Sequence, residues 1–120
     1  YDHLAGTAGV ALFDALVANG DLVAARDGLA PSAAGRARFA AFGIDMDELD
    51  ARRRPLCRAC LDWSERRPHL AGSLGAALLQ AFVARGWTAP DRRTRAMVFS
   101  AKGRTAFDAF LRAASKAKAG

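Results

Sequence analysis

An internal repeat is the feature that most constrains how this chain can fold. The segment from His3 to Gly20 recurs from His69 to Gly86 at an offset of 66 residues, with 11 of 18 positions identical. A second block, Ser32 to Phe42, recurs from Ser100 to Phe110 at an offset of 68, with 7 of 11 positions identical. Since both blocks recur in the same order, we expect the second half to repeat the fold of the first.

Each copy opens with a pattern that predicts a helix. Apolar residues at helical spacing follow His3 and His69, and Gly20 and Gly86 stand where a left-handed residue ends a helix without a Cβ penalty. Short strands should follow, at about 22–25 and 29–31 in the first copy and at about 87–89 and 96–99 in the second. Each pair of strands is separated by a polar turn and is therefore expected to form a hairpin.

Each copy closes with a second predicted helix, which Ser32 or Ser100 would cap at its N-terminus. The predicted fold class is therefore α+β and mainly helical. Two tandem helix–β-hairpin–helix units, each resembling half of a winged helix, would be related by a pseudo-twofold axis. We expect one internally duplicated domain over residues 1–120, with repeat A at about 3–43, a linker at about 44–68 and repeat B at about 69–115.

The linker is predicted to be mostly irregular. Asp45 and Glu48 have the spacing of a capping box and should start a short helix that ends near Arg53, before Pro55. The stretch 56–68 shows no periodic pattern and is expected to lack regular structure.

Composition narrows the class of protein. The chain is 52% hydrophobic, but no apolar run reaches the ~18 residues of a membrane span, so no membrane partner is expected. Two cysteines three positions apart form no disulfide framework, and we expect both to be reduced and unbridged in the cytoplasm. The sequence contains no catalytic triad, phosphate loop or paired-acid motif, so no enzyme is predicted.

Three segments carry a resemblance to a known family. Ser100-Ala101-Lys102-Gly103-Arg104 resembles the signature that closes many winged-helix hairpins. The stretches 1–6 (Tyr-Asp-His-Leu-Ala-Gly) and 60–72 (from Cys-Leu-Asp-Trp-Ser-Glu to His-Leu-Ala-Gly) resemble the C-terminal region of a subgroup of ArsR-type bacterial transcriptional regulators. This resemblance covers essentially the whole chain.

The resemblance implies a cytoplasmic regulator that binds DNA through a winged helix upstream of this chain, forms a homodimer and is released from DNA by an effector. In the subgroup a cysteine often directly precedes the first of these stretches, which implies a further thiol just before Tyr1. That thiol would join Cys60 if the intact protein senses a soft ion.

Cys57 and Cys60 supply two soft ligands about one turn apart, which suits zinc or another thiophilic ion. His69 would be the third member of such a metal site. A closed zinc site needs four ligands, however, and the chain has no second cysteine pair. We therefore expect no bound cofactor in this chain, and two packed thiols in the linker as the simpler interpretation.

The linker and the repeats also suggest a binding site for an effector. His3 and His69 are equivalent positions at the expected starts of two helices and would either face one shared pocket or only satisfy backbone groups in a first helical turn. A polar segment ahead of His69 would line the same pocket, with an arginine holding a carboxylate. Its members are Asp62, Trp63, Glu65, Arg66 and Arg67. The alternative is structural: Asp62 or Ser64 caps the next helix, Trp63 fills the core, and the charges pair in solvent.

Arginines would also allow contact with nucleic acid. The formal net charge is +6, and Arg92, Arg93 and Arg95 stand at the tip of the second predicted hairpin, where a wing would touch phosphates. The predicted helix after Gly6 lacks Lys and Arg, and the one after Gly72 has only Arg85 at its end, which argues against reading of bases.

We therefore expect a C-terminal module that senses an effector, supports dimerisation, or does both, in a DNA-binding regulator. Two alternatives stay open: a thiol-based metal, metalloid or redox sensor around Cys57 and Cys60, and a module that binds nucleic acid directly.

Overall fold

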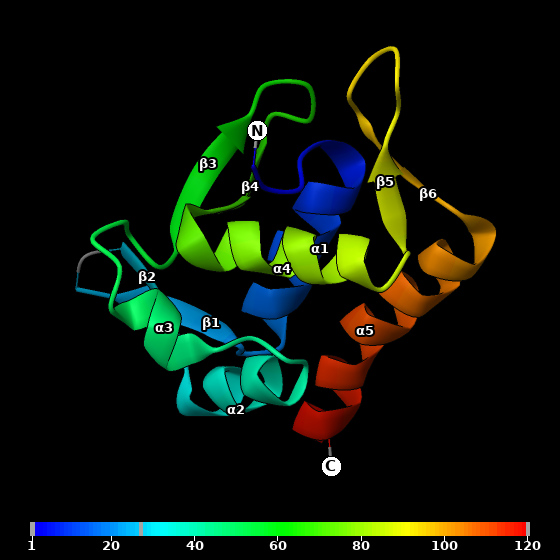
Figure 1. Cartoon of the computed structure of the whole chain (residues 1–120). Coiled ribbons are helices and arrows are strands. Elements are labelled where there is room, and N and C mark those ends of the chain that lie inside the picture. Colours follow the sequence, from blue (N-terminus) through cyan, green and yellow to red (C-terminus); the bar gives the residue numbers. More distant parts are fainter. Residues whose placement is uncertain (1, 27, 120) are drawn as a thin grey trace.

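The structure is a computed structural model that describes residues 2–26 and 28–119, with side chains of the last helix described up to residue 112. Helices and short antiparallel hairpins alternate along the chain (Figure 1). The first elements are α1 (Gly6–Ala18), β1 (Leu22–Ala25), β2 (Gly28–Pro31), α2 (Ala33–Ala41) and α3 (Met46–Asp50). The others are β3 (Arg58–Asp62), β4 (Arg67–Ala71), α4 (Gly72–Ala84), β5 (Thr88–Pro90), β6 (Met97–Phe99) and α5 (Ala101–Ala119). The mixed α+β class is as predicted.

The helix–hairpin–helix order appears in both halves, as α1-β1-β2-α2 and as α4-β5-β6-α5. Gly20 and Gly86 follow the C-caps of α1 and α4 with φ of 80° and 75°, the left-handed conformation that the sequence predicted. The hydroxyl of Ser32 accepts a hydrogen bond from the Gly35 N–H, and that of Ser100 accepts one from the Gly103 N–H. The polar turn predicted between the first two strands falls partly outside the described residues, because residue 27 is not among them.

Equivalent glycines make equivalent close contacts in the two halves. A Cβ at Gly9 would lie 2.3 Å from the Leu4 carbonyl oxygen and 3.4 Å from the His69 Cβ. A Cβ at Gly75 would lie 2.6 Å from the Leu70 carbonyl oxygen and 3.4 Å from the His3 Cβ. Each half therefore approaches the histidine of the other, which is the arrangement that a pseudo-twofold axis would give; the axis itself stays a prediction.

The linker differs from the prediction. The short helix α3 is capped by Asp45, which accepts from the Glu48 N–H as expected, but it ends at Asp50. The stretch expected to be irregular forms a β-hairpin of its own, in which β3 pairs with β4. Pro68 made this strand hard to predict, because proline cannot donate to a ladder. It is tolerated here because the sheet has only two strands, so each strand has an open edge.

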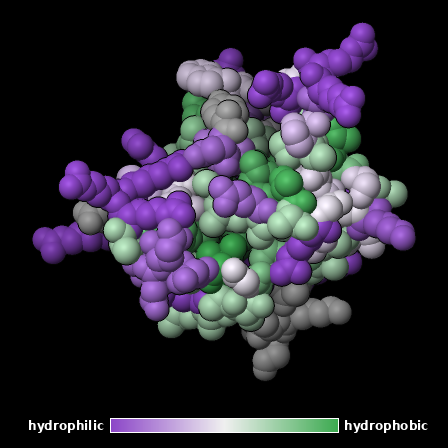
Figure 2. Space-filling view, in the orientation of Figure 1, coloured by the Kyte–Doolittle hydropathy of each residue, from purple (hydrophilic) through white to green (hydrophobic). Residues whose placement is uncertain are grey.

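The hydrophobic core lies between the helices of both halves, and a cluster of aromatic side chains packs within it. Phe82 stacks on Trp87 with ring centroids 5.4 Å apart and contacts Phe107 and Phe110 edge-on. Phe39 and the leucines of α1 and α4 fill the remainder. Figure 2 shows hydrophilic side chains at the left and the upper right of the molecule, and hydrophobic ones near the centre of the view, where α4 lies in Figure 1. Among the described residues, no helix is long and apolar enough to cross a membrane.

Candidate metal centre

The register of the β3–β4 hairpin brings Cys60 and His69 together. The two residues are direct partners in the antiparallel ladder, so their side chains leave the same face of the hairpin at the same level. Alternation along β3 directs Leu61 outward, where it is 45% exposed, and leaves Asp62 buried on the same side as Cys60. The pairing thus places a thiol, an imidazole and a carboxylate on the inner face.

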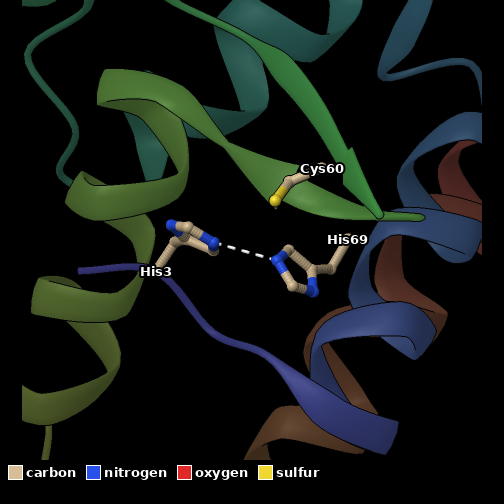
Figure 3. A group of neighbouring side chains, drawn as sticks. All are labelled: His3, Cys60 and His69. Atoms are coloured by element: carbon tan, nitrogen blue, oxygen red, sulfur yellow. Dashed lines mark hydrogen bonds between the residues drawn. The ribbon is translucent and has the colours of Figure 1, made fainter. Parts of the chain in front are cut away.

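His3 reaches this face from the opposite end of the chain. It lies in the segment before α1, and its Nε2 is 2.9 Å from Nε2 of His69 (Figure 3). His3 is 8% exposed and His69 is fully buried. The sequence suggested that both histidines lie in the first turn of a helix. Neither does, because α1 and α4 begin three residues later, at Gly6 and Gly72. The extended segments before the helices allow the two rings to meet.

Asp62 anchors the site through five accepted hydrogen bonds. Its Oδ1 accepts from the N–H groups of Ser64 and Glu65 and from the Ser64 hydroxyl. Its Oδ2 accepts from the Gly6 N–H at 2.6 Å and from Nδ1 of His69 at 2.9 Å. The Ser64 hydroxyl and the Gly6 N–H hold the pKa of Asp62 far below its ordinary value. The carboxylate also caps α1, whose own N-cap residue, Ala5, has no side chain suited to that role.

Carboxylates fix the orientation of both imidazoles. Nδ1 of His3 lies 3.1 Å from Oδ1 of Asp2, as Nδ1 of His69 lies beside Asp62. An ionised carboxylate only accepts hydrogen bonds, so each Nδ1 is the donor and Nε2 of each ring is the atom that faces the other histidine. The Asp2 pKa is held low by hydrogen bonds from Arg54 and His3, whereas burial lowers the pKa of His3. The two Nε2 atoms are 2.9 Å apart, a distance at which a hydrogen bond joins the two rings.

His3, Cys60 and His69 are grouped closely enough to hold an ion. One ligand atom from each lies within 4.8 Å of the others, and among the described residues no other set of three His, Cys, Asp or Glu side chains does so. This trio differs from the sequence-based set of Cys57, Cys60 and His69. Cys57 packs against the core instead, and burial raises the pKa of its thiol to about 12. Tyr1, before which the resemblance implies a further thiol, lies outside the described residues.

The remaining residues of the linker segment lie at the surface. Trp63 is 68% exposed, with the guanidinium of Arg66 5.5 Å from its ring centroid, so it does not fill the core. Glu65 and Arg66 are exposed, and Arg67 pairs with Asp14 at 2.9 Å. The tight turn between β3 and β4, in which Arg66 has a φ of 58°, directs these side chains to solvent.

A cleft with a volume of about 560 Å³ lies beside His3. The segment before α1 and the start of α1 form one wall, and the β5–β6 hairpin with the start of α5 forms the other. Its cationic lining groups are Arg95 and Arg104, and Met97 and Phe99 are among its apolar ones. Of the effector residues suggested by the sequence, only His3 lines it. Sequence reasoning did not identify the other lining residues, because the sequence does not reveal that the β5–β6 hairpin faces the segment before α1.

The tip of that hairpin carries the predicted arginine cluster. Arg92, Arg93 and Arg95 are all exposed, and Asp91 orders the turn by accepting from the N–H groups of Arg93 and Thr94. The β5–β6 loop stands away from the helices in Figure 1. Helices α1 and α4 carry no Lys or Arg within their bounds.

Comparison with known proteins points to transcription. The chain is 38% identical over 111 residues to a Bacillus subtilis protein described as the uncharacterized HTH-type transcriptional regulator YdfF. The match covers 92% of this chain and 49% of that relative, so the chain spans about half of the relative's length. No family model matches the sequence. No solved structure matches it either. The similarity therefore links this chain to a regulator of transcription and gives no indication of catalysis.

Proposed function

We propose that this chain is the regulatory part of an HTH-type transcriptional regulator of the ArsR kind, whose DNA-reading winged helix lies in another part of the protein. The similarity to half of a regulator supports this division of labour. So does the composition of α1 and α4. In a winged helix the recognition helix directly precedes the hairpin, and α1 and α4 have this position before β1–β2 and β5–β6. Neither helix has a cationic side chain to contact phosphates or bases. Such a protein would act in the cytoplasm.

The proposal that this chain senses an effector rests on the cleft beside His3. An effector in it would touch both the segment before α1 and the β5–β6 hairpin, which belong to different halves of the chain. A ligand that makes different contacts in two arrangements of these halves would shift the population between them. Arg95 and Arg104 beside Met97 and Phe99 suit a small anionic molecule with an apolar body.

Selection from a pool of random duplex DNA tests the division of labour. The 120-residue chain and a longer protein that contains it would be compared at ~200 mM salt, where contacts to phosphates alone are weak. We expect the longer protein to enrich a defined sequence and the chain alone to enrich none. A sequence motif enriched by the chain alone would overturn the proposal.

Direct binding of nucleic acid is the second candidate function, and the exposed Arg92, Arg93 and Arg95 favour it. These side chains could contact phosphates as the tip of a wing does. A salt titration of binding to duplex DNA would show this function as sequence-independent binding that weakens as the salt concentration rises and is lost when the three arginines are replaced by alanine.

Support for a homodimer is the second part of the proposed role. Leu61, 45% exposed on β3, and Trp63, 68% exposed in the turn that follows, are two large apolar side chains that a second copy of the chain would cover. Sedimentation velocity would measure the mass of the chain and of the variant with both Leu61→Ser and Trp63→Ser. We expect a dimer for the first and a monomer for the second, and a monomer in both cases would remove dimerisation from the proposal.

A further inference from the structure

We propose that His3, Cys60 and His69 form a binding site for one divalent ion of the zinc class. The site goes beyond the regulatory role proposed above, and it does not depend on whether the protein binds DNA. The sequence alone favoured no bound metal, because a closed zinc site needs four ligands and the chain has no second cysteine pair. The position of Cys60 opposite His69 then adds a sulfur ligand to the two nitrogens.

The spacing of the ligand atoms is close to what a tetrahedral ion needs. With Zn–N bonds of about 2.0–2.1 Å, two imidazole nitrogens on one tetrahedral ion are about 3.3 Å apart. Nε2 of His3 and Nε2 of His69 are 2.9 Å apart, so the rings need to separate by only a few tenths of an ångström. The ligand atoms of the three residues lie within 4.8 Å of one another, so the Cys60 sulfur has to approach the nitrogens by up to about 1.2 Å to reach the about 3.6 Å that such an ion requires.

Hydrogen bonds outside the trio prepare both histidines for a metal. Metal-bound histidines usually donate their second N–H to a carboxylate or carbonyl group, which fixes the ring and makes the ligand nitrogen more basic. Asp62 has this role for His69, and Asp2 has it for His3. Both rings therefore direct Nε2 towards the same point, and Figure 3 shows the Cys60 sulfur beside the line that joins them.

The ligand set selects the ion. Two imidazoles and one thiolate suit zinc and related borderline or soft ions, whereas magnesium and calcium require oxygen ligands. Cys60 would lose its proton to solvent as it binds the ion. The three side chains leave one tetrahedral position for water or another ligand. A shallow cleft of about 390 Å³ reaches Cys60, and the larger cleft reaches His3, so ions have access although the imidazoles are buried.

Titration with Co²⁺ tests the site directly, because cobalt reports its ligands by absorption. The reduced 120-residue chain would be compared with Cys60→Ser and with Cys57→Ser, which changes the same side chain three positions away but outside the trio. We expect one Co²⁺ per chain, the strong visible bands of tetrahedral cobalt and a thiolate charge-transfer band in the near ultraviolet. Cys57→Ser should retain all three features, and Cys60→Ser should lose the charge-transfer band.

Competition between the protein and a chromogenic chelator then gives the affinity for Zn²⁺. We expect the affinity of Cys60→Ser to be at least about 100-fold lower, and that of Asp2→Asn to be about 10–100-fold lower. Circular dichroism would establish that the variants are folded. Equal affinities in the wild type and Cys60→Ser, loss of binding in Cys57→Ser, or no binding by the folded wild type would each overturn the site. In the last case, the hydrogen bond between the two imidazoles joins them without an ion.

Discussion

Cys57 and Cys60 show how much the surroundings of single residues matter, because they are three positions apart and differ in chemistry. Burial raises the pKa of Cys57 to about 12, so at pH 8 only about one thiol in ten thousand is ionised. Since the thiolate is the nucleophile, we expect iodoacetamide to leave Cys57 unmodified in the folded chain at pH 8. Mass spectrometry of the digested protein would measure the modification of each cysteine.

Unfolding the chain in urea supplies the control for this labelling. Cys57 should then react as fast as a cysteine in a short peptide, because the burial that raises its pKa is lost. Complete modification of Cys57 in the folded state within the same time would contradict the packing of its side chain against the core.

Replacing three serines at the starts of helices by alanine is expected to change the free energy of unfolding in opposite directions. The Ser73 hydroxyl in α4 is fully buried and is the one buried side-chain polar atom without a hydrogen-bond partner among the described residues. We expect Ser73→Ala to raise the free energy of unfolding by about 1 kcal/mol, since the cost of an unpaired buried group disappears. Ser32→Ala and Ser100→Ala should each lower it by about 1 kcal/mol, because both hydroxyls cap helices. Urea denaturation would measure all three, and a destabilising Ser73→Ala would indicate a partner for that hydroxyl.

Among the secondary-structure elements, the β3–β4 hairpin and α1 are joined by the Asp62 carboxylate, and this link should depend on pH. The pKa of Asp62 is lower in the folded state than in the unfolded chain. Its stabilising effect is therefore fully present above the unfolded pKa of about 3.9 and is lost as the pH falls below that value. We expect the free energy of unfolding to decrease steeply between pH 4 and pH 2.

Asp62→Asn identifies the source of this pH dependence. The variant should be less stable than the wild type at pH 6, and the difference should shrink as the pH is lowered towards 2, because the wild-type carboxylate then becomes neutral as well. Urea denaturation at a series of pH values would measure both proteins. A difference that stays constant from pH 6 to pH 2 would show that ionised Asp62 does not support the link.

Local signals predicted most elements of the repeats, and the linker hairpin was missed for a physical reason. Gly20 and Gly86 end helices, and Ser32 and Ser100 start them, through contacts with residues nearby in the sequence, so the pattern itself contains the information. The β3–β4 hairpin instead contains Pro68, has a polar outer turn and gains its stability from packing against α1. That support is invisible in the local sequence.

The candidate site was predictable only in part, for the same reason. The repeat showed that His3 and His69 are equivalent, and the proposal that both face one site came from that equivalence. The family resemblance already singled out Cys60 as the thiol of a soft-ion site, but its place beside His69 depends on the register of a hairpin that the sequence did not predict. The wall of the cleft formed by the β5–β6 hairpin likewise depends on how the two halves pack.

For the whole molecule, the proposed ion would act as a cross-link. His3 is separated from His69 by 66 residues, and the β3–β4 hairpin that presents Cys60 and His69 lies between the two halves. An ion that binds the folded chain and not the unfolded one stabilises it by about 2.7 kcal/mol at 100 times its dissociation constant. We therefore expect ZnCl₂ to raise the free energy of unfolding of the reduced chain in proportion to the logarithm of the free Zn²⁺ concentration.

Urea denaturation at increasing free Zn²⁺ would measure this effect in the wild type, Cys57→Ser and Cys60→Ser. The first two should gain stability in parallel, because Cys57 lies outside the trio, and Cys60→Ser should stay nearly constant over the same range. Unfolded cysteine and histidine side chains also bind zinc, which reduces the gain at high concentrations equally in the two serine variants. The difference between those variants therefore isolates the contribution of the folded site. If all three proteins gain equally, the ion binds elsewhere, and the two halves are held together by the histidine pair and Asp62 without it.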